Sequence, residues 1–509
     1  MPTTPPTDAD IVELAARYRL HLTSADVTSF RDIISGALAS YDTVERLYNE
    51  SAPRAPTNRQ YHWPEPERNP LGAWYLRTEI ATGAQGPLSG RNVAVKDNIA
   101  LAGVPMTNGS RSVEGFVPTR DATVVSRVLD AGGAIIGKAV CEDLCFAGAS
   151  FTAVSGQVRN PWDQSRHAGG SSSGCAALLA AGEIDLAIGG DQGGSVRMPA
   201  AFCGVVGHKP THGLVPYTGA FPIESTLDHL GPMSRTVRDA ALLLSVLAGD
   251  DGFDPRQYRT PRPQDYLAAT ESGLDGLRIG VVTEGFGLPD VSEPEVDASV
   301  RAAVGQLMDA GARANEVSIP WHRHGLDIWN VIGTDGTTGQ MIDGNGYGMN
   351  WQGRYDPELI AHYGEGRLEH ADELSETVKF VALNGRYCID RYHGRYYAMA
   401  RELAWQLRAV YDAALEEFDV LVMPTVPYVA KPLPTSDLSR EDYLFLALSM
   451  LGNTTAFDVT GHPAISVPAR AVGGLPVGMM IIGRRFDDAM CLRVAAGYER
   501  AVGGFPTAT

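Results

Sequence analysis

The chain has 509 residues, of which 44% are hydrophobic, and this is enough for a sizeable buried core. Its formal net charge is -18, because 60 acidic side chains outnumber 42 basic ones. An acidic chain without a basic cluster is repelled by phosphate backbones and by anionic lipid. We therefore expect neither nucleic acid nor a membrane surface as a partner.

Targeting and cysteine features point to the cytoplasm. No stretch approaches the roughly 18 apolar residues of a membrane-spanning helix. The segment MPTTPPTDAD lacks the positive patch and the apolar run of a secretory signal. The cysteines form neither a CxxC pair nor a dense disulfide framework, so we expect free, buried thiols. They lie scattered at Cys141, Cys145, Cys175, Cys203, Cys388 and Cys491.

The N-terminal part of the chain differs in pattern from the rest. Residues 9–50 place apolar side chains at helical spacing, as at Ile11, Leu14 and Ala15, and predict a small helical unit. Residues 51–70 are rich in proline and polar side chains, which predicts a linker toward the next domain.

From about residue 86 the sequence alternates between helical and strand patterns. The segment GRNVAVKDNIA predicts a strand, and DATVVSRVLDAGGAIIGKAV predicts a helix, a glycine turn and a buried strand. A helix and then a strand recur in GSSSGCAALLAAGEIDLAIGGD and EPEVDASVRAAVGQLMDAGARANEVSIP, while GLRIGVVTEG and FDVLVMPTVPY predict further strands. Residues 355–418 are mainly helical in pattern, and LPVGMMIIGRRFDDAMCLRVAAGYERAV returns to a strand followed by a helix. This alternation favours an α/β sheet covered on both faces.

Two Gly/Ser clusters, residues 169–174 and 193–195, flank a small-residue helix and a strand, and three common uses of such sequences fit them poorly. A flexible linker rarely lies between elements of an α/β core. A nucleophile elbow needs a strand before the G-x-S-x-G centred on Ser172, and the upstream segment VRNPWDQSRHAG does not have a strand pattern. A phosphate cradle is disfavoured because no G-x-x-x-x-G-K-[ST] motif occurs.

The remaining interpretation is a group of converging hydroxyls and backbone N–H donors. One helix out and one strand back separate Ser171 from Ser195, so both turns can lie at the same edge of the sheet. Gly193 and Gly194 let the backbone turn tightly with its N–H groups directed at one spot, as an oxyanion hole requires. A serine beside such a hole needs a base. Because no histidine is an obvious candidate, the base is expected to be a lysine.

Three segments together resemble the amidase signature family. GGSSSG and AIGGDQGGSVRMPAAFCGVVGHKPTHGLVP are similar to the signature region, VAVKDNIALAGVPMTNGS to the lysine segment, and TGHPAISVPARAVGGLPVGMMIIGRRFDD to the C-terminal segment. The resemblance is dense from about residue 86 to 240 and its motifs are long and specific. Within the family, RDATVVSRVLDAGG and GKAVCEDLCFAG are most similar to nitrile-pathway amidases of soil actinobacteria.

The resemblance implies an α/β amidase-signature fold, in which a central mixed β-sheet is covered by helices on both faces. We predict an N-terminal helical unit over 1–70 and the first part of the amidase core over 71–330. An inserted, mainly helical small domain follows over 331–420, and the C-terminal part of the core spans 421–509. Because the N-terminal helices resemble a dimerisation unit, a homodimer is expected.

The family uses a Ser–cis-Ser–Lys triad, and its motifs align with three residues of this chain. Lys96 stands at the lysine, Ser171 at the bridging serine after a cis peptide bond, and Ser195 at the acylated nucleophile. The physical chemistry agrees, because an alcohol is a poor nucleophile until a base removes its proton. A lysine is such a base only as a neutral amine, and burial favours that form by penalising the charged ammonium.

The resemblance also implies the course of the reaction. Ser195 attacks the amide carbonyl, and Lys96 passes a proton through Ser171 to the leaving ammonia. Water then attacks the acyl-enzyme with the same relay as base, so neither a metal nor a cofactor is needed. Backbone N–H groups are expected to hold the oxyanion, and they belong to Gln192, Gly193, Gly194 and Ser195.

Five neighbouring residues have expected structural roles. Ser172 is expected to form structural hydrogen bonds, and Asp191 to orient the residues around it. Arg197 is expected to be an ion-pair partner, with substrate contact as the alternative. Ser173 and Cys175 depart from the Gly and Ser that are common in the family, which leaves the triad intact and indicates a difference in local packing.

Similarity to the nitrile-pathway amidases implies small-molecule amides with apolar aliphatic or aromatic acyl groups, such as benzamide. Candidates for the acyl pocket are hydrophobic, and for each of them a plain core position is the alternative. They are Phe146, Leu227, Trp329 and Leu451. Glutamine-using relatives that act on charged tRNA need polar groups for the amino acid, and the segment YLFLALSMLGNTTAF offers almost none.

Several other functions stay open as alternatives. The same site would suit anilides, carbamates or esters, and a component of a glutamine amidotransferase is a more distant possibility within the family. Residues 321–324, WHRH, place an H-x-H after a predicted strand, as in metal-dependent amidohydrolases, but no convincing set of further ligands follows. A non-enzymatic carrier or scaffold would require loss of the triad, which the sequence retains.

Overall fold

A computed structural model of the protein describes residues 3–258, 260–347, 352–435 and 437–508. The chain divides into two compact units, Met1–Ala55 and Pro56–Thr509. The four-part division expected from the sequence stays a prediction, and its inserted section contains residues 348–351, which lie outside the described part.

The first unit consists of two helices, α1 (Asp8–Arg17) and α2 (Ser24–Ser51). Both begin with a capping box, in which a threonine accepts from the backbone N–H three residues on and an aspartate returns the bond. The prediction of helices over residues 9–50 is therefore confirmed. The segment expected to be only a linker also contains β1 (Tyr61–His62), which pairs with β2 (Trp74–Ile80) in the second unit.

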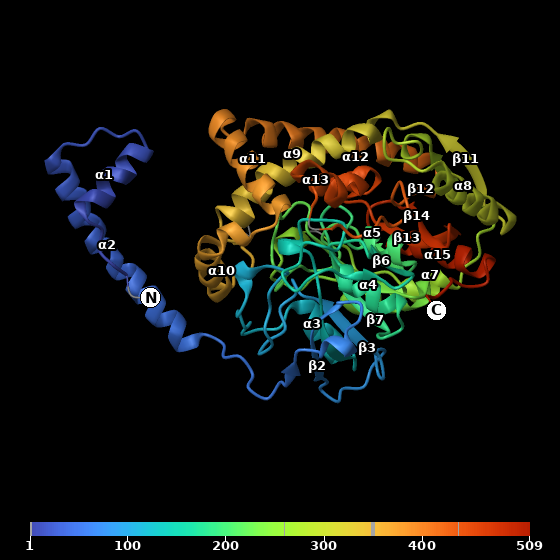
Figure 1. Ribbon diagram of the computed structural model, residues 1–509, viewed down its shortest axis with the longest axis horizontal. Coiled ribbons are helices and arrows are strands. Elements are labelled where there is room, and N and C mark those ends of the chain that lie inside the picture. The colour runs from blue at the N-terminus through green and yellow to red at the C-terminus, as the bar shows by residue number, and fades with distance from the viewer. Residues whose placement is uncertain (1–2, 259, 348–351, 436, 509) are drawn as a thin grey trace. The chain divides into compact units, whose positions relative to one another are not determined.

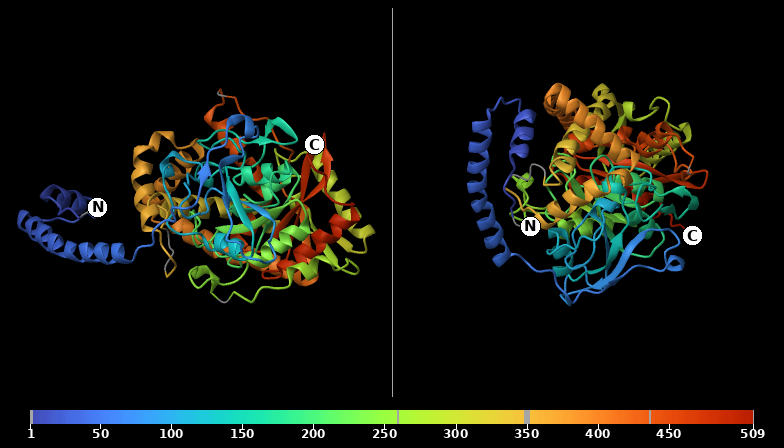
Figure 2. Two further views of the ribbon diagram at one scale, coloured as in Figure 1. Left: turned by 90° about the horizontal axis from the view of Figure 1, so that it is seen from below. Right: turned by 60° about the vertical axis from the view of Figure 1, so that its left-hand side comes forward.

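The second unit is built on a mixed sheet (Figures 1 and 2), which has twelve strands within the described residues. In spatial order they are β1, β2, β4 (Ala134–Ala139), β3 (Asn92–Lys96), β7 (Leu186–Asp191), β9 (His229–Ser234), β8 (Val206–Lys209), β13 (Ala464–Val472), β14 (Leu475–Ile482), β12 (Val420–Pro424), β10 (Arg278–Val282) and β11 (Arg313–Val317). Strand β3 is parallel to β4 and β7, and β10 is parallel to β11 and β12. Antiparallel pairing of β8 with β13 joins the C-terminal segment to the centre of the sheet.

Helices pack on both faces of this sheet, as expected. One face is covered by α3 (Thr123–Asp130), α6 (Val237–Leu247), α8 (Pro294–Asp309) and α15 (Asp488–Ala501), with α7 (Tyr266–Thr270) against α6 and α15. The other face carries α4 (Ser173–Ala180) and α5 (Arg197–Cys203). Beyond the sheet lie α9 (Gly325–Thr337), α10 (Pro357–Glu369), α11 (Glu376–Tyr392), α12 (Arg395–Glu417), α13 (Arg440–Leu448) and α14 (Thr455–Thr460). Both α11 and α12 pack against α9 (Figure 1), so the helical prediction for 355–418 is confirmed.

The alternation of β3 explains where its last residue points. Val93 and Val95 are fully buried in the cluster that includes α3 and α6, whereas Ala94 belongs to the cluster around α4. Because successive side chains of a strand point to opposite faces, Lys96 lies on the same face as Ala94. Its side chain is thereby directed toward the N-terminal end of α4, where Ser171 precedes the helix.

The segment before α4 differs from the sequence prediction. VRNPWDQSRHAG was expected to contain no strand, and this is wrong, because β5 (Arg159–Asn160) and β6 (Asp163–His167) form a small antiparallel hairpin. Its polar side chains hide the pattern, and the Asn160 amide stabilises it through bonds to His167 O and Phe202 O. The hairpin is separate from the main sheet, so it does not supply the sheet strand of a nucleophile elbow.

Candidate active site

The two Gly/Ser clusters meet at one edge of the sheet. The first precedes α4, and the second lies between the end of β7 and the start of α5. The backbone N–H of Ser172 donates to the carbonyl of Ser195 at 3.2 Å, which joins the two turns directly. The Gly170–Ser171 peptide bond is cis.

Lys96 contacts the first of these turns in the interior of the protein. Its Nζ donates to Ser171 Oγ at 2.7 Å and lies 3.4 Å from the carbonyl oxygen of Gly190, and both side chains are fully buried. No carboxylate within the described residues forms an ion pair with Lys96. The adjacent Asp97 pairs instead with Lys138 on β4, at 2.7 Å. The structure therefore brings Lys96 and Ser171 together and leaves the amine without a counter-charge.

The two other serines of the turns have different surroundings. Ser172 Oγ donates to the carbonyl of Gly190 at 3.1 Å and accepts from its N–H at 3.2 Å, so this hydroxyl is committed to β7. Ser195 lies in the second turn, is 5% exposed and lines a cavity. Ser195 alone of these two presents its side chain to a space that a ligand can enter.

The loop after β7 offers fewer free N–H groups than the sequence indicated. Gly194 N–H donates to Asp191 Oδ1 at 2.7 Å, so the expectation that this group holds an oxyanion is wrong in this geometry. The N–H groups of Gln192, Gly193 and Ser195 donate to no acceptor within the described part of the chain. The structure thus leaves three of the four predicted donors unpaired beside the Ser195 side chain.

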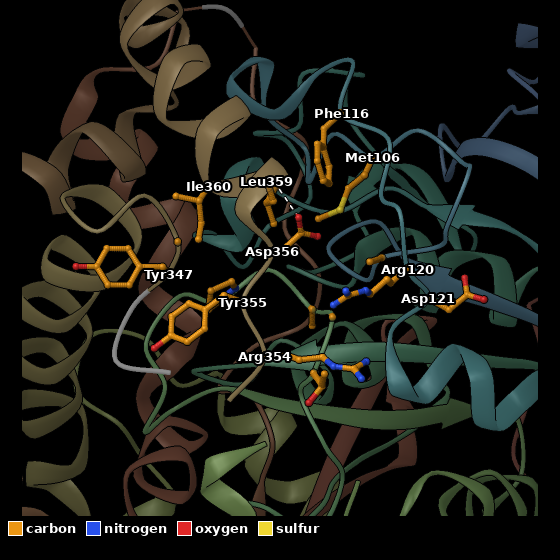
Figure 3. Close-up of a pocket in the computed structure, with 16 residues that line it drawn as sticks. Met106, Phe116, Arg120, Asp121, Tyr347, Arg354, Tyr355, Asp356, Leu359 and Ile360 are labelled. Carbon is orange, nitrogen blue, oxygen red and sulfur yellow. Dashed lines mark hydrogen bonds between the residues drawn. The ribbon is translucent and has the colours of Figure 1, made fainter. Parts of the chain in front are cut away.

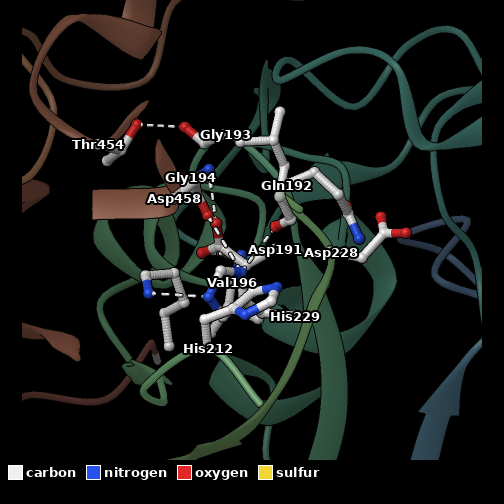
Figure 4. A network of polar contacts seen from close by, with 12 residues as sticks. Asp191, Gln192, Gly193, Gly194, Val196, His212, Asp228, His229, Thr454 and Asp458 are labelled. Carbon is white, nitrogen blue, oxygen red and sulfur yellow. Dashed lines mark hydrogen bonds and ion pairs between the residues drawn. The ribbon is translucent and has the colours of Figure 1, made fainter. Parts of the chain in front are cut away.

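Asp191 fixes this loop from below through a fully buried network (Figure 4). Its second carboxylate oxygen accepts from Val196 N–H at 3.0 Å, and Arg197 bridges its side chain to that of Asp458. Burial raises the pKa of Asp191, but the Arg197 guanidinium outweighs it and holds the pKa well below its usual range. Burial and the negative charge of Asp191 together raise the pKa of Asp458 well above its usual range. Arg197 is thus an ion-pair partner, as expected.

The cavity at Ser195 has a volume of about 450 Å³, a size typical of small-molecule pockets. The four predicted acyl-pocket residues come from separate elements and all line it. Its described lining comprises Cys145, Phe146, Ala147, Gly148, Gln192, Gly193, Ser195, Met198, Ile223, Glu224, Leu227, Trp329, Gly333, Thr337, Leu448 and Leu451. The walls are mostly apolar, and Phe146 and Trp329 stack with ring centroids 6.5 Å apart.

Glu224 is a charged residue of this lining that sequence reasoning missed. Its Oε2 accepts from the backbone N–H of Thr226 at 2.8 Å and from the hydroxyl of the same residue at 2.5 Å. Its Oε1 accepts from Gln340 Nε2 at 2.9 Å and from the Tyr397 hydroxyl at 2.8 Å. Because both oxygens are saturated by the protein, this carboxylate anchors the cavity wall rather than awaiting a cationic ligand.

Two further buried groups lie near Lys96. Burial raises the pKa of the Glu142 carboxyl to about 7, although three hydrogen bonds from Phe151 and Thr152 oppose this. Burial also raises the pKa of Cys145, but Cys141 and Lys96 outweigh it and lower that pKa to about 7. Neither residue carries a motif that would have drawn attention in the sequence alone.

The H-x-H segment has another role in the structure. His322 Nδ1 lies 2.6 Å from the Tyr411 hydroxyl, and its Nε2 lies 3.0 Å from Asn453 Oδ1, so both ring nitrogens are engaged in the core. Among the described residues, no group of three or more His, Cys, Asp or Glu side chains is arranged to hold a metal ion.

A second cavity lies beside α10 and is lined by none of the predicted site residues (Figure 3). Its carboxylates already have partners. Asp356 caps α10 by accepting from Leu359 N–H at 3.0 Å, and Asp121 forms a two-point ion pair with Arg59. This cavity therefore shows, within the described lining, no unpaired acid that would act on a ligand.

Fold and site together define an α/β enzyme in which a buried Lys–Ser pair lies beside an apolar cavity. The model of the Amidase family matches residues 69–492, and the chain belongs to this family. It is 54% identical to an enantioselective amidase of Rhodococcus rhodochrous, over 99% of this chain and 97% of that protein. The chain is an amide-hydrolysing enzyme.

Solved structures show the same fold. Peptide amidase from Stenotrophomonas maltophilia aligns with a TM-score of 0.68 and 28% identity, covering 83% of this chain and 85% of that one. One component of the glutamyl-tRNA(Gln) amidotransferase from Thermotoga maritima aligns with a TM-score of 0.71 and 30% identity, covering 86% and 90%. No described helix combines the length and the apolarity that crossing a bilayer requires.

Proposed function

We propose that the enzyme hydrolyses amides of apolar aliphatic or aromatic acids to the acid and ammonia, through an acyl-enzyme on Ser195. The observation that carries this proposal is the 2.7 Å contact of Lys96 Nζ with Ser171 Oγ in a fully buried site. Ser195 stands in the adjoining turn, at the wall of the apolar cavity. The three residues act as base, proton relay and nucleophile.

Activation begins at the amine. Burial without an anionic partner favours the neutral form of a lysine, because the charged form would lose its hydration without compensation. Neutral Lys96 takes the hydroxyl proton of Ser171, and Ser171 takes that of Ser195 as its oxygen attacks the amide carbon. The relay then returns a proton to the leaving nitrogen, so that ammonia departs and the acyl group stays on Ser195.

Backbone donors stabilise the negative charge that forms on the carbonyl oxygen. The unpaired N–H groups of Gln192, Gly193 and Ser195 supply these donors, and the Asp191 network holds their loop in place. Preorganised donors of this kind lower the barrier because they need no rearrangement when the charge develops. Water then attacks the acyl carbon, with the same relay as base.

The walls of the cavity support the choice of substrate. Phe146, Leu227, Trp329 and Leu451 present apolar surface, and the saturated Glu224 presents no free lone pair. Glutamine, the alternative suggested by the amidotransferase relatives, has an α-carboxylate that calls for a cation. The described lining contains neither lysine nor arginine, and this favours benzamide-like or aliphatic amides.

A hydrolysis panel tests the substrate class. Benzamide, propionamide, an anilide, a urethane, an ester and glutamine are offered to the wild-type enzyme and to Ser195→Ala, with ammonia or amine release as the readout. We expect turnover of the first two amides, lost in the variant. Strong glutamine turnover without benzamide turnover would overturn the substrate class, and activity retained by the variant would overturn the nucleophile.

We further propose a cytoplasmic homodimer that acts in nitrile metabolism, where a nitrile-hydrating enzyme supplies the amide. The N-terminal unit supports the dimer, because Ile33, Tyr41 and Val44 on α2 are 63–65% exposed although they are apolar. Sedimentation of the wild type and of Ile33→Asp/Val44→Asp is the test. A dimer that the double variant converts to monomer is expected, and a wild-type monomer would contradict the proposal.

A further inference from the structure

Two side chains outside the proposed triad fix the orientation of the loop that follows β7. In a trans peptide unit the carbonyl and the N–H point in opposite directions, so holding one sets the other. Trp329 Nε1 on α9 donates to the carbonyl of Gln192 at 2.7 Å, and the N–H of the same peptide unit belongs to Gly193. That N–H is one of the unpaired donors of the proposed oxyanion hole.

The next peptide unit is fixed in the same way. The Thr454 hydroxyl donates to the carbonyl of Gly193, and the N–H of this unit, that of Gly194, donates to Asp191. Two consecutive peptide planes are thus set by side chains from distant parts of the chain. The first plane differs from the second because its N–H has no partner among the described residues.

Close packing makes this arrangement tight. A Cβ atom on Gly193 would lie only 2.8 Å from the Trp329 ring, and one on Gly194 only 2.4 Å from Thr454 Oγ1. Both positions therefore require glycine, because the two anchoring side chains lie directly on the backbone. The same Trp329 ring is 8% exposed and lines the acyl cavity beside Phe146.

We propose that Trp329 is a positioning residue that couples acyl-group binding to the oxyanion hole. Its ring forms part of the wall that the acyl group contacts, and its indole N–H holds the peptide whose opposite end donates to the oxyanion. An acyl group that packs on the ring restrains the indole and thereby the donor. This role rests on the proposed acyl-enzyme mechanism and adds to it a reason why substrates that fill the cavity react faster.

Trp329→Phe removes the indole N–H and keeps an aromatic wall. We expect kcat for benzamide to fall about tenfold while KM changes less than about threefold, since the lost bond acts on the transition state. An aryl trifluoromethyl ketone gives a second readout. The Ser195 oxygen bonds to its carbonyl carbon, the carbonyl electron pair becomes the oxyanion, and the serine proton passes through Ser171 to Lys96.

Affinity for this ketone should fall about tenfold in Trp329→Phe, while affinity for benzoate, which forms no oxyanion, should stay within about threefold. Trp162→Phe is the matched control. Trp162 Nε1 donates to the carbonyl of Cys203 at 2.8 Å and lies outside the described cavity lining, so its loss should leave kcat and ketone affinity unchanged. Equal loss of kcat in both variants would mean a general packing effect and would overturn the inference.

Thr454→Val keeps the inference testable if Trp329→Phe fails to fold. It frees the Gly193 carbonyl without touching the acyl cavity, so kcat should fall severalfold with the ratio of benzamide to propionamide KM unchanged. A loss in KM alone, or a shift of ketone and benzoate affinity by the same factor, would overturn the inference. A wild-type enzyme that neither hydrolyses benzamide nor binds the ketone would instead overturn the proposed function.

Discussion

Replacing Asp191 by asparagine removes the charge that holds the nucleophile loop. The carboxylate accepts from Gly194 and Val196 backbone N–H groups and forms a two-point pair with Arg197, and every one of these groups is fully buried. An asparagine of the same shape offers one acceptor oxygen and turns an NH₂ group toward other donors. Removing one partner of a buried ion pair costs about 3–5 kcal/mol, because the remaining charge stays buried without full compensation.

This free energy converts to a modest thermal shift. With an unfolding entropy of about 2.1 cal/mol/K per residue over roughly 450 residues, 3–5 kcal/mol lowers the thermal midpoint by roughly 3–5 °C. Because the loop carries the proposed oxyanion donors, kcat should also fall, by about a hundredfold or more. Differential scanning fluorimetry and benzamide turnover, measured on the same preparation, give both numbers.

The control for this prediction is an aspartate of an exposed pair. Asp343 pairs with Arg386 at 2.7 Å, with both side chains more than 40% exposed. Asp343→Asn should shift the midpoint by less than about 1 °C, because surface ion pairs contribute about 0–1 kcal/mol. If Asp191→Asn keeps the midpoint and kcat of the wild type, then the buried network does not hold the loop and the reasoning is refuted.

Two further predictions concern the neighbourhood of the site. Glu142 keeps its proton more readily when folded, since burial raises its pKa from 4.5 to about 7, so the stability it contributes is full below pH 4.5 and is lost as pH rises to 7. At 1.36 kcal/mol per pKa unit, Glu142→Gln should gain about 2–3 kcal/mol relative to wild type between pH 5 and pH 8, and a constant offset across that range would contradict this. Leu451→Ala widens the cavity and should raise KM for propionamide about tenfold while bulkier amides improve. The exposed Leu368→Ala should leave this selectivity unchanged, and equal effects of the two variants would refute the assignment of the wall.

Local patterns were sufficient to predict the main elements and the reacting groups. The strand that ends in Lys96 shows apolar alternation, and the turns at Ser171 and Ser195 contain unusual Gly/Ser clusters, so each is visible within a few residues of sequence. Helix–strand alternation likewise predicted the covered sheet. The resemblance to the amidase signature family added the roles of these residues, which spacing alone did not provide.

Contacts between distant segments could not be predicted in this way. Thr454 lies 261 residues from Gly193 in the chain, and nothing near either residue indicates their bond. Glu224 is anchored by Gln340 and Tyr397, again from remote helices. The use of Gly194 N–H by Asp191 depends on the angle of one turn, which no residue pattern encodes. The polar run GNTT, which contains Thr454, does stand out within an apolar segment, but it does not indicate which backbone group the threonine contacts.

The most direct test of the account is the benzamide kcat/KM of Lys96→Met, a variant that keeps the length and the apolar stem of the side chain. General-base catalysis is typically worth about 10²–10⁴-fold, so with the thermal midpoint preserved we predict a loss of about 10³-fold or more. A variant that folds and retains activity within about tenfold of the wild type would contradict the central claim that this buried amine activates the serines.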